Sequence, residues 1–181
     1  MEKYLINQLI NKKIILEQEK EIYCFGICQL IMLLLNICTS FFISLCYGRI
    51  IEGMIFSSAY ILLRSYAGGY HAKTRKRCYI LSSLMAVIVF PIIELSKNRI
   101  IICGEIIMSA VMILILAPVD VKNKRLENIE KQMYRKKCIY IFFFEILCCI
   151  CFALLRKIQY ASCISVACTI TAFMLVIGKV K

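Results

Sequence analysis

A single histidine and one of twelve cysteines are the side chains of this chain best suited to nucleophilic chemistry. His71 lies in the basic segment 64–78, and an imidazole can exchange protons near neutral pH. Cys78 closes that segment, directly after a run of cations, and an apolar run begins at Tyr79. Nearby cations and the start of a helix both favour the thiolate form of a cysteine. The pair therefore predicts a thiolate nucleophile with an imidazole base, as in a cysteine peptidase.

The other eleven cysteines lie inside or at the edges of apolar runs, where a thiol behaves as a small hydrophobic group. Cys138 is the nearest competitor, because an apolar run begins there after two lysines, but its segment contains no histidine. A cluster at 148, 149 and 151 also lacks a histidine, so no metal site and no cofactor are expected. The remaining cysteines are at 24, 28, 38, 46, 103, 163 and 168. Their abundance favours a reducing environment over a disulfide framework.

The segment between the histidine and the cysteine must fold back on itself for the two to meet. On one straight helix, His71 and Cys78 would lie about 10.5 Å apart, too far for proton transfer. We therefore expect residues 72–77 to form a turn. Gly68 and Gly69 permit backbone conformations closed to other residues, and their N–H groups are candidate oxyanion donors. A simple helix stop explains the two glycines equally well, and both roles can hold together.

The elements that carry these residues are predicted to lie in a membrane. Apolar residues make up 61% of the chain and are gathered into runs at 24–47, 79–95, 100–118, 138–155 and 160–178. Each run has about the length that a membrane-spanning helix requires, roughly 20 residues. A sixth run, 50–63, is either a short span or a re-entrant helix, and we favour a span. The sequence thus predicts an all-α polytopic bundle in one domain, 1–181, with residues 1–23 as a cytosolic or interfacial helix rather than a signal peptide.

The positive charges of the chain predict its orientation in the membrane. Eighteen of the 23 Lys and Arg residues fall in segments 1–23, 64–78, 119–137 and 179–181, and five fall in the other connections. Basic segments remain cytoplasmic, so both termini and the His71 segment are expected inside. A nucleic-acid partner is not expected, because no soluble domain is available to present the charges. Anionic lipid headgroups are expected partners, although simple solvation of the loops explains the same charges.

The spacing of these residues resembles a known signature. The pattern R-x3-G-G-x-H-A-x5-C, formed by Arg64, Gly68, Gly69, His71, Ala72 and Cys78, looks like that of the AgrB family. These are membrane cysteine endopeptidases of quorum sensing in Gram-positive bacteria. The resemblance extends over nearly the whole chain and includes A-P-V-D-x2-N-K at 117–124.

The resemblance implies that the chain processes an AgrD-like precursor peptide in the bacterial cell membrane. The family removes the C-terminal tail of the precursor and joins the new end to an internal Cys or Ser as a thiolactone or lactone. Cys78 would be the nucleophile and His71 its base. Arg64, Gly68 and Gly69 would position the reaction, Asp120 would orient His71, and a homodimer is compatible with the family. The cations of the His71 segment would recruit an acidic tail: Lys73, Arg75, Lys76 and Arg77.

Two other functions remain open on the residues alone. One is a non-catalytic membrane protein, such as a peptide exporter or an accessory protein. The other is metal binding by His71 and Cys78, which two ligands alone make unfavourable.

Overall fold

The structure, a computed structural model, describes residues 20–69, 74–119 and 128–180 of the chain. Within these ranges the chain forms six helices and no strand, which confirms the all-α prediction. Two compact units are present, Met1–Thr39 and Ser40–Lys181. The described part of the first unit, residues 20–39, is helical. The expectation of one domain over 1–181 stays a prediction.

The six helices follow the apolar runs closely. They are α2 (Lys20–Cys46), α3 (Ile50–Ala67), α4 (Arg75–Leu95), α5 (Arg99–Leu116), α6 (Asn128–Leu154) and α7 (Ile158–Val180). Five of them, all except α3, are long and apolar enough to cross a membrane. The polytopic helical bundle predicted from the sequence is therefore confirmed.

Helix α3 carries the sixth apolar run, and it runs the length of the bundle although it is less apolar. Its first residues follow Arg49, which pairs with Glu94 at the end of α4. At its other end, Gly68 pairs with Val119, just beyond the end of α5. Its 18 residues would cover about 27 Å, close to the hydrocarbon thickness of a bilayer. These contacts favour the predicted span over a re-entrant helix.

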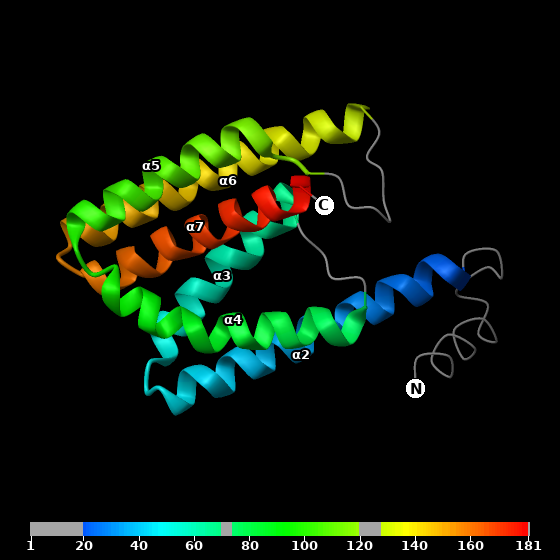
Figure 1. Cartoon of the computed structure of the whole chain (residues 1–181), viewed down its shortest axis with the longest axis horizontal. Coiled ribbons are helices and arrows are strands. Elements are labelled where there is room, and N and C mark those ends of the chain that lie inside the picture. The colour runs from blue at the N-terminus through cyan, green and yellow to red at the C-terminus, as the bar shows by residue number, and fades with distance from the viewer. Residues whose placement is uncertain (1–19, 70–73, 120–127, 181) are drawn as a thin grey trace. The chain divides into compact units, whose positions relative to one another are not determined.

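Helix α7 lies at the centre of the second unit and packs against α3, α4, α5 and α6 (Figure 1). Its contact faces are built from small side chains, and Ala161, Cys163, Ala167 and Cys168 are fully buried. Small residues let helix backbones approach closely in a membrane, where packing rather than water exclusion holds helices together. Large apolar side chains instead cover the outer surface of the other helices, as Ile100 and Leu154 do. Such a surface is suited to lipid.

Two acidic side chains inside the apolar runs are bonded to small polar groups of α7. The Glu145 carboxylate on α6 is buried and accepts a hydrogen bond from the Cys168 thiol at 3.2 Å. The Glu105 carboxylate on α5 accepts from the hydroxyls of Ser96 and Ser165, each at 2.6 Å. Intramembrane acids are costly unless they are bonded, so these contacts tie α5 and α6 to the central helix.

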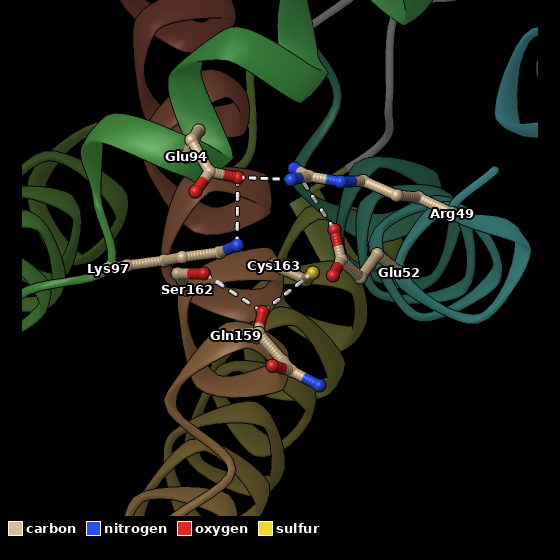
Figure 2. Close-up of polar contacts among 7 residues, drawn as sticks. All are labelled: Arg49, Glu52, Glu94, Lys97, Gln159, Ser162 and Cys163. Atoms are coloured by element: carbon tan, nitrogen blue, oxygen red, sulfur yellow. Dashed lines mark hydrogen bonds and ion pairs between the residues drawn. The ribbon is translucent and has the colours of Figure 1, made fainter. Parts of the chain in front are cut away.

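Short connections close the bundle at the end opposite Gly68. There the Glu94 carboxylate pairs with Arg49 at 2.5 Å and with Lys97 at 2.8 Å, while Arg49 also lies 3.6 Å from Glu52 (Figure 2). The hydrogen bond that Arg49 donates to the Glu94 carboxylate raises the pKa of Arg49, so this guanidinium stays charged. In the same view, Ser162 and Cys163 both donate to the Gln159 carbonyl in the first turns of α7 (Figure 2).

Candidate active site

The first part of the signature forms the end of α3. The Gly68 N–H donates to the Arg64 carbonyl at 3.2 Å and closes the last helical turn. In return, the Arg64 guanidinium donates to the Gly68 carbonyl. Gly68 has φ of 74°, a left-handed conformation that ends the helix and that glycine adopts most easily. The predicted helix stop is therefore confirmed, and the Gly68 N–H is already occupied by a hydrogen bond.

The second sequence motif lies directly beside the first. Val119 pairs with Gly68 in a parallel bridge, and its N–H donates to the Ala67 carbonyl at 3.1 Å. A Cβ atom on Gly68 would collide with the Val119 carbonyl oxygen. The residues 117–119 that follow α5 therefore hold the glycine pair from one side, which the sequence alone did not predict.

Gly69 is held from the other side by the central helix. A Cβ atom at this position would lie 3.0 Å from the Met174 carbonyl oxygen and would also collide with the Arg64 guanidinium. Gly69 is buried, and its φ of 116° is one that residues with side chains rarely adopt. Arg64, Val119 and Met174 thus fix the point at which the chain leaves α3 towards His71.

Cys78 lies in the first turn of α4, which begins at Arg75, so the turn predicted over residues 72–77 is wrong for 75–77. Thr74 caps the helix: its hydroxyl accepts from the Arg77 N–H at 3.4 Å, and its carbonyl accepts from the Cys78 N–H at 3.0 Å. A threonine cap satisfies N–H groups that would otherwise lack partners, which explains the start at Arg75 rather than at Tyr79. The Cys78 residue is partly exposed, so a reagent or substrate can reach it.

The first turn of α4 carries charges that are unfavourable at a helix N-terminus. Its first turn carries Arg75, Lys76 and Arg77 and no acidic residue. Cations at the positive end of a helix dipole each cost roughly 0.3–1 kcal/mol. Local violations of this kind tend to occur at functional sites, where another requirement overrides stability. These three residues place positive charge in the same turn as Cys78.

Cys78 lies at the same end of the bundle as the last turn of α3, because α3 ends at Ala67 and α4 begins at Arg75. Tyr60 precedes Arg64 by one turn on the same face of α3, where its ring stacks on Phe56 with centroids 5.8 Å apart. The structure therefore brings Arg64, Gly68, Gly69 and Cys78 to the same end of the bundle.

Three of the predicted site residues lie outside the described part of the chain. They are the candidate base His71, the candidate orienting residue Asp120, and Lys73. The contact between His71 and Cys78 accordingly stays a prediction. Of the other predicted cations, Lys76 and Arg77 are exposed in the first turn of α4.

The interpretation of Cys138 as the start of a helix is wrong. Helix α6 begins at Asn128, so Cys138 lies three turns inside it and is fully buried. The intervening residues include Glu130, Lys131 and Gln132, which are good helix formers although they are polar, and they extend the helix beyond the apolar run. The partial positive charge of a helix N-terminus therefore does not favour a thiolate at Cys138. Cys78 remains the better candidate nucleophile.

A cavity of about 600 Å³ is lined in part by Val119, the residue that pairs with Gly68, and was missed by sequence reasoning. Residues 115–119 form part of its wall, and α6 and α7 contribute the rest: Lys131, Gln132, Arg135 and Lys179. The sequence signal for it was the high charge of segment 119–137, but nothing in the pattern showed that Lys179 would join that segment. Across the described ranges, no group of three His, Cys, Asp or Glu side chains could hold a metal ion.

The fold and these residues define a class: a polytopic helical membrane protein with a cysteine among cations at one end of the bundle. The chain belongs to the AgrB family, Accessory gene regulator B, whose sequence model matches residues 2–175. The resemblance seen in the sequence is thus confirmed, and with it a place in the accessory gene regulator system of quorum sensing.

Two curated relatives come from Clostridium perfringens. An AgrB-like protein of strain SM101 / Type A is 27% identical over 145 residues, which cover 73% of this chain and 68% of the relative. AgrB-like protein 2 of strain 13 / Type A is 26% identical over the same coverage. No solved structure matches the chain.

Proposed function

We propose that this protein is a membrane-bound cysteine endopeptidase that cleaves the C-terminal tail from an AgrD-like precursor and promotes cyclisation of the remaining peptide. The observation that carries the proposal is the joint placement of the signature residues. Arg64, Gly68 and Gly69 form a fixed support at the end of α3, and Cys78 follows in the cation-rich first turn of α4. Membership of the AgrB family supports the same reaction and the same kind of partner.

The proposed reaction starts at the Cys78 sulfur. His71 removes the thiol proton, and the sulfur attacks the carbonyl carbon of the scissile peptide bond. The C–N bond then breaks, His71 returns the proton to the departing amine, and the tail leaves. The precursor remains attached to Cys78 as a thioester. Of the two glycines, Gly69 has the N–H that we assign to the carbonyl oxygen, because the Gly68 N–H is bonded to Arg64.

Cyclisation is the second half of the reaction. An internal Cys or Ser of the bound peptide attacks the thioester carbonyl, the C–S bond to Cys78 breaks, and the thiol of Cys78 is restored. When the attacking group is a thiol, one thioester replaces another, so little driving force is needed. Holding the two groups together raises their effective concentration, and a water-poor site at the membrane boundary limits hydrolysis.

Co-expression with the precursor tests the proposal. The precursor would be expressed with the wild-type chain, with Cys78→Ala, or with Cys138→Ala as a matched control, and the released tail and peptide would be followed by mass spectrometry. We expect Cys78→Ala to abolish tail release and Cys138→Ala to stay within a few-fold of wild type. Tail release that persists in Cys78→Ala would instead favour a non-catalytic exporter or accessory protein.

A further inference from the structure

The cavity beside the glycine pair is strongly positive. Of the described residues that line it, Lys131, Arg135 and Lys179 are basic and none is acidic. All three residues are exposed. The cavity lies where α5 and α7 end and α6 begins, at the end of the bundle that carries Gly68 and Gly69.

Helix dipoles explain the positions of only two of these three cations. The Arg135 guanidinium donates to the Leu114 carbonyl at 3.3 Å, in the last turn of α5, and Lys179 lies in the last turn of α7. Cations are favourable at both places, because helix C-termini carry partial negative charge. The dipoles do not explain why three cations surround one cavity of about 600 Å³ with no acid among its described lining. The net positive charge of the described lining is suited to an anionic ligand.

The apolar side of the cavity indicates what kind of anion fits. Ile115 lines the cavity and is 70% exposed. It continues a stripe of exposed side chains along one face of α5 that also contains Met108 and Val111. In a membrane, this stripe faces acyl chains. A ligand that has an anionic head and apolar chains would place the head among the cations and the chains along α5.

We propose that this cavity binds the headgroup of an anionic phospholipid, with its phosphate near Lys131, Arg135 and Lys179. Basic pockets between spanning helices at the membrane boundary are suited to such headgroups. A soluble acidic peptide would satisfy the cations, but it would leave the exposed α5 stripe without a role. The lipid accounts for both features.

The lipid would also stabilise the support of the active site, an extension that rests on the proposed function. Val119 lines the cavity and at the same time pairs with Gly68 and bonds to Ala67. A bound headgroup would restrain residues 117–119 and, through them, the glycine pair. Peptide processing should therefore be faster in membranes that contain anionic lipid.

Lipid retention tests the binding site without any need for peptidase activity. The full chain would be placed in vesicles of phosphatidylcholine with about 20 mol% phosphatidylglycerol, extracted into mild detergent, and examined by native mass spectrometry. The test variant is Lys131→Gln/Lys179→Gln. The matched control is Arg99→Gln/Lys136→Gln, which loses the same charge at positions that do not line the cavity. Melting temperatures would verify that each variant is folded.

We expect the wild type and the control to retain one phosphatidylglycerol per chain, and the test variant to retain about tenfold less. Equal retention by all three proteins would overturn the proposal, since attraction to the whole basic surface would then explain binding. Displacement of the lipid by a soluble oligoglutamate peptide would also overturn it, by showing a peptide site. Tail release measured with and without phosphatidylglycerol tests only the proposed effect of the lipid on peptide processing. Equal tail release would contradict that effect, whereas the lipid site and the peptidase activity are each decided by their own experiment.

Discussion

Gly69 is the residue whose identity the structure explains most directly. It enters the space between the Arg64 guanidinium and the Met174 carbonyl of α7, with a backbone conformation that disfavours any side chain. Its neighbour Gly68 meets the Val119 backbone in the same way. The two glycines therefore let three segments, distant in sequence, converge at the start of the His71 segment.

Replacing Gly69 by alanine should damage both stability and activity. The positive φ alone costs about 1 kcal/mol, and the added methyl would displace α7 or Arg64. We expect at least a tenfold loss of tail release and a lower melting temperature in detergent. Gly104→Ala on α5 is the matched control, because its Cβ would meet nothing within 4 Å. If the two variants were equally active, the packing role of Gly69 would be refuted.

The two best cysteine candidates should differ sharply in chemical reactivity. Cys78 is partly exposed in a first helical turn, whereas Cys138 is fully buried within α6. A water-soluble maleimide should therefore modify Cys78 well before Cys138 in the folded protein. Peptide mapping by mass spectrometry after a short exposure would measure both rates. Faster modification of Cys138 would contradict the assignment of Cys78 as the accessible nucleophile.

At this scale, sequence reasoning identified the chemistry but not the contacts. Cys78 could be singled out because its cations and its helix start are local features of the sequence. The Gly69–Met174 contact could not, since Met174 lies more than a hundred residues further along the chain. Local pattern shows that a glycine is needed, and only the fold shows what it makes room for.

At the scale of elements, residues 117–119 act as a support for the end of α3. The backbone hydrogen bond from the Val119 N–H to the Ala67 carbonyl joins the two sequence motifs. The Ala117–Pro118 dipeptide reads in sequence as an ordinary helix stop, and α5 does end at Leu116. The support that these residues give to α3 depends on where α5 ends relative to α3. Local sequence patterns do not predict that arrangement.

Removing that hydrogen bond should lower activity more than removing the Val119 side chain. Val119→Pro deletes the donor N–H, whereas Val119→Ala keeps it, so the alanine variant is the matched control. The loss of one hydrogen bond is worth about 1 kcal/mol, enough to change the population of the supported loop several-fold. We expect Val119→Pro to reduce tail release at least fivefold and Val119→Ala to stay near wild type. Equal effects of both changes would show that the side chain, not the bridge, matters.

Helix existence was predictable here, whereas helix boundaries were less so. Apolar runs of about twenty residues leave few alternatives to a spanning helix, and all the spans predicted on this basis are helical. The apolar runs did not predict the early starts of α4 and α6, because the residues that extend these helices beyond the runs are polar. Thr74 was the available signal for α4, as a capping residue directly before the cations.

At the scale of the second unit, contacts between helix ends bring the basic segments together at one end of the bundle. Gly68 pairs with Val119, and Lys179 shares a cavity with Val119 and Lys131, so three basic segments gather at one end. Arg49, Glu94 and Lys97 gather at the other end, where the connections are short (Figure 2). The distribution of Lys and Arg alone predicted that these basic segments lie on one side of the membrane. The contacts, which were not used in that prediction, agree with it.

Reporter fusions test which end is cytoplasmic. Because basic segments resist translocation, the end with Gly68, Lys131 and Lys179 should face the cytoplasm. A green fluorescent protein fused after the last residue should then fluoresce, and alkaline phosphatase at the same place should be inactive. Phosphatase inserted between Lys97 and Asn98 should be active instead. The reverse pattern would place Cys78 and its cations outside the cell, away from a newly made precursor peptide, and the proposed reaction would lose its substrate.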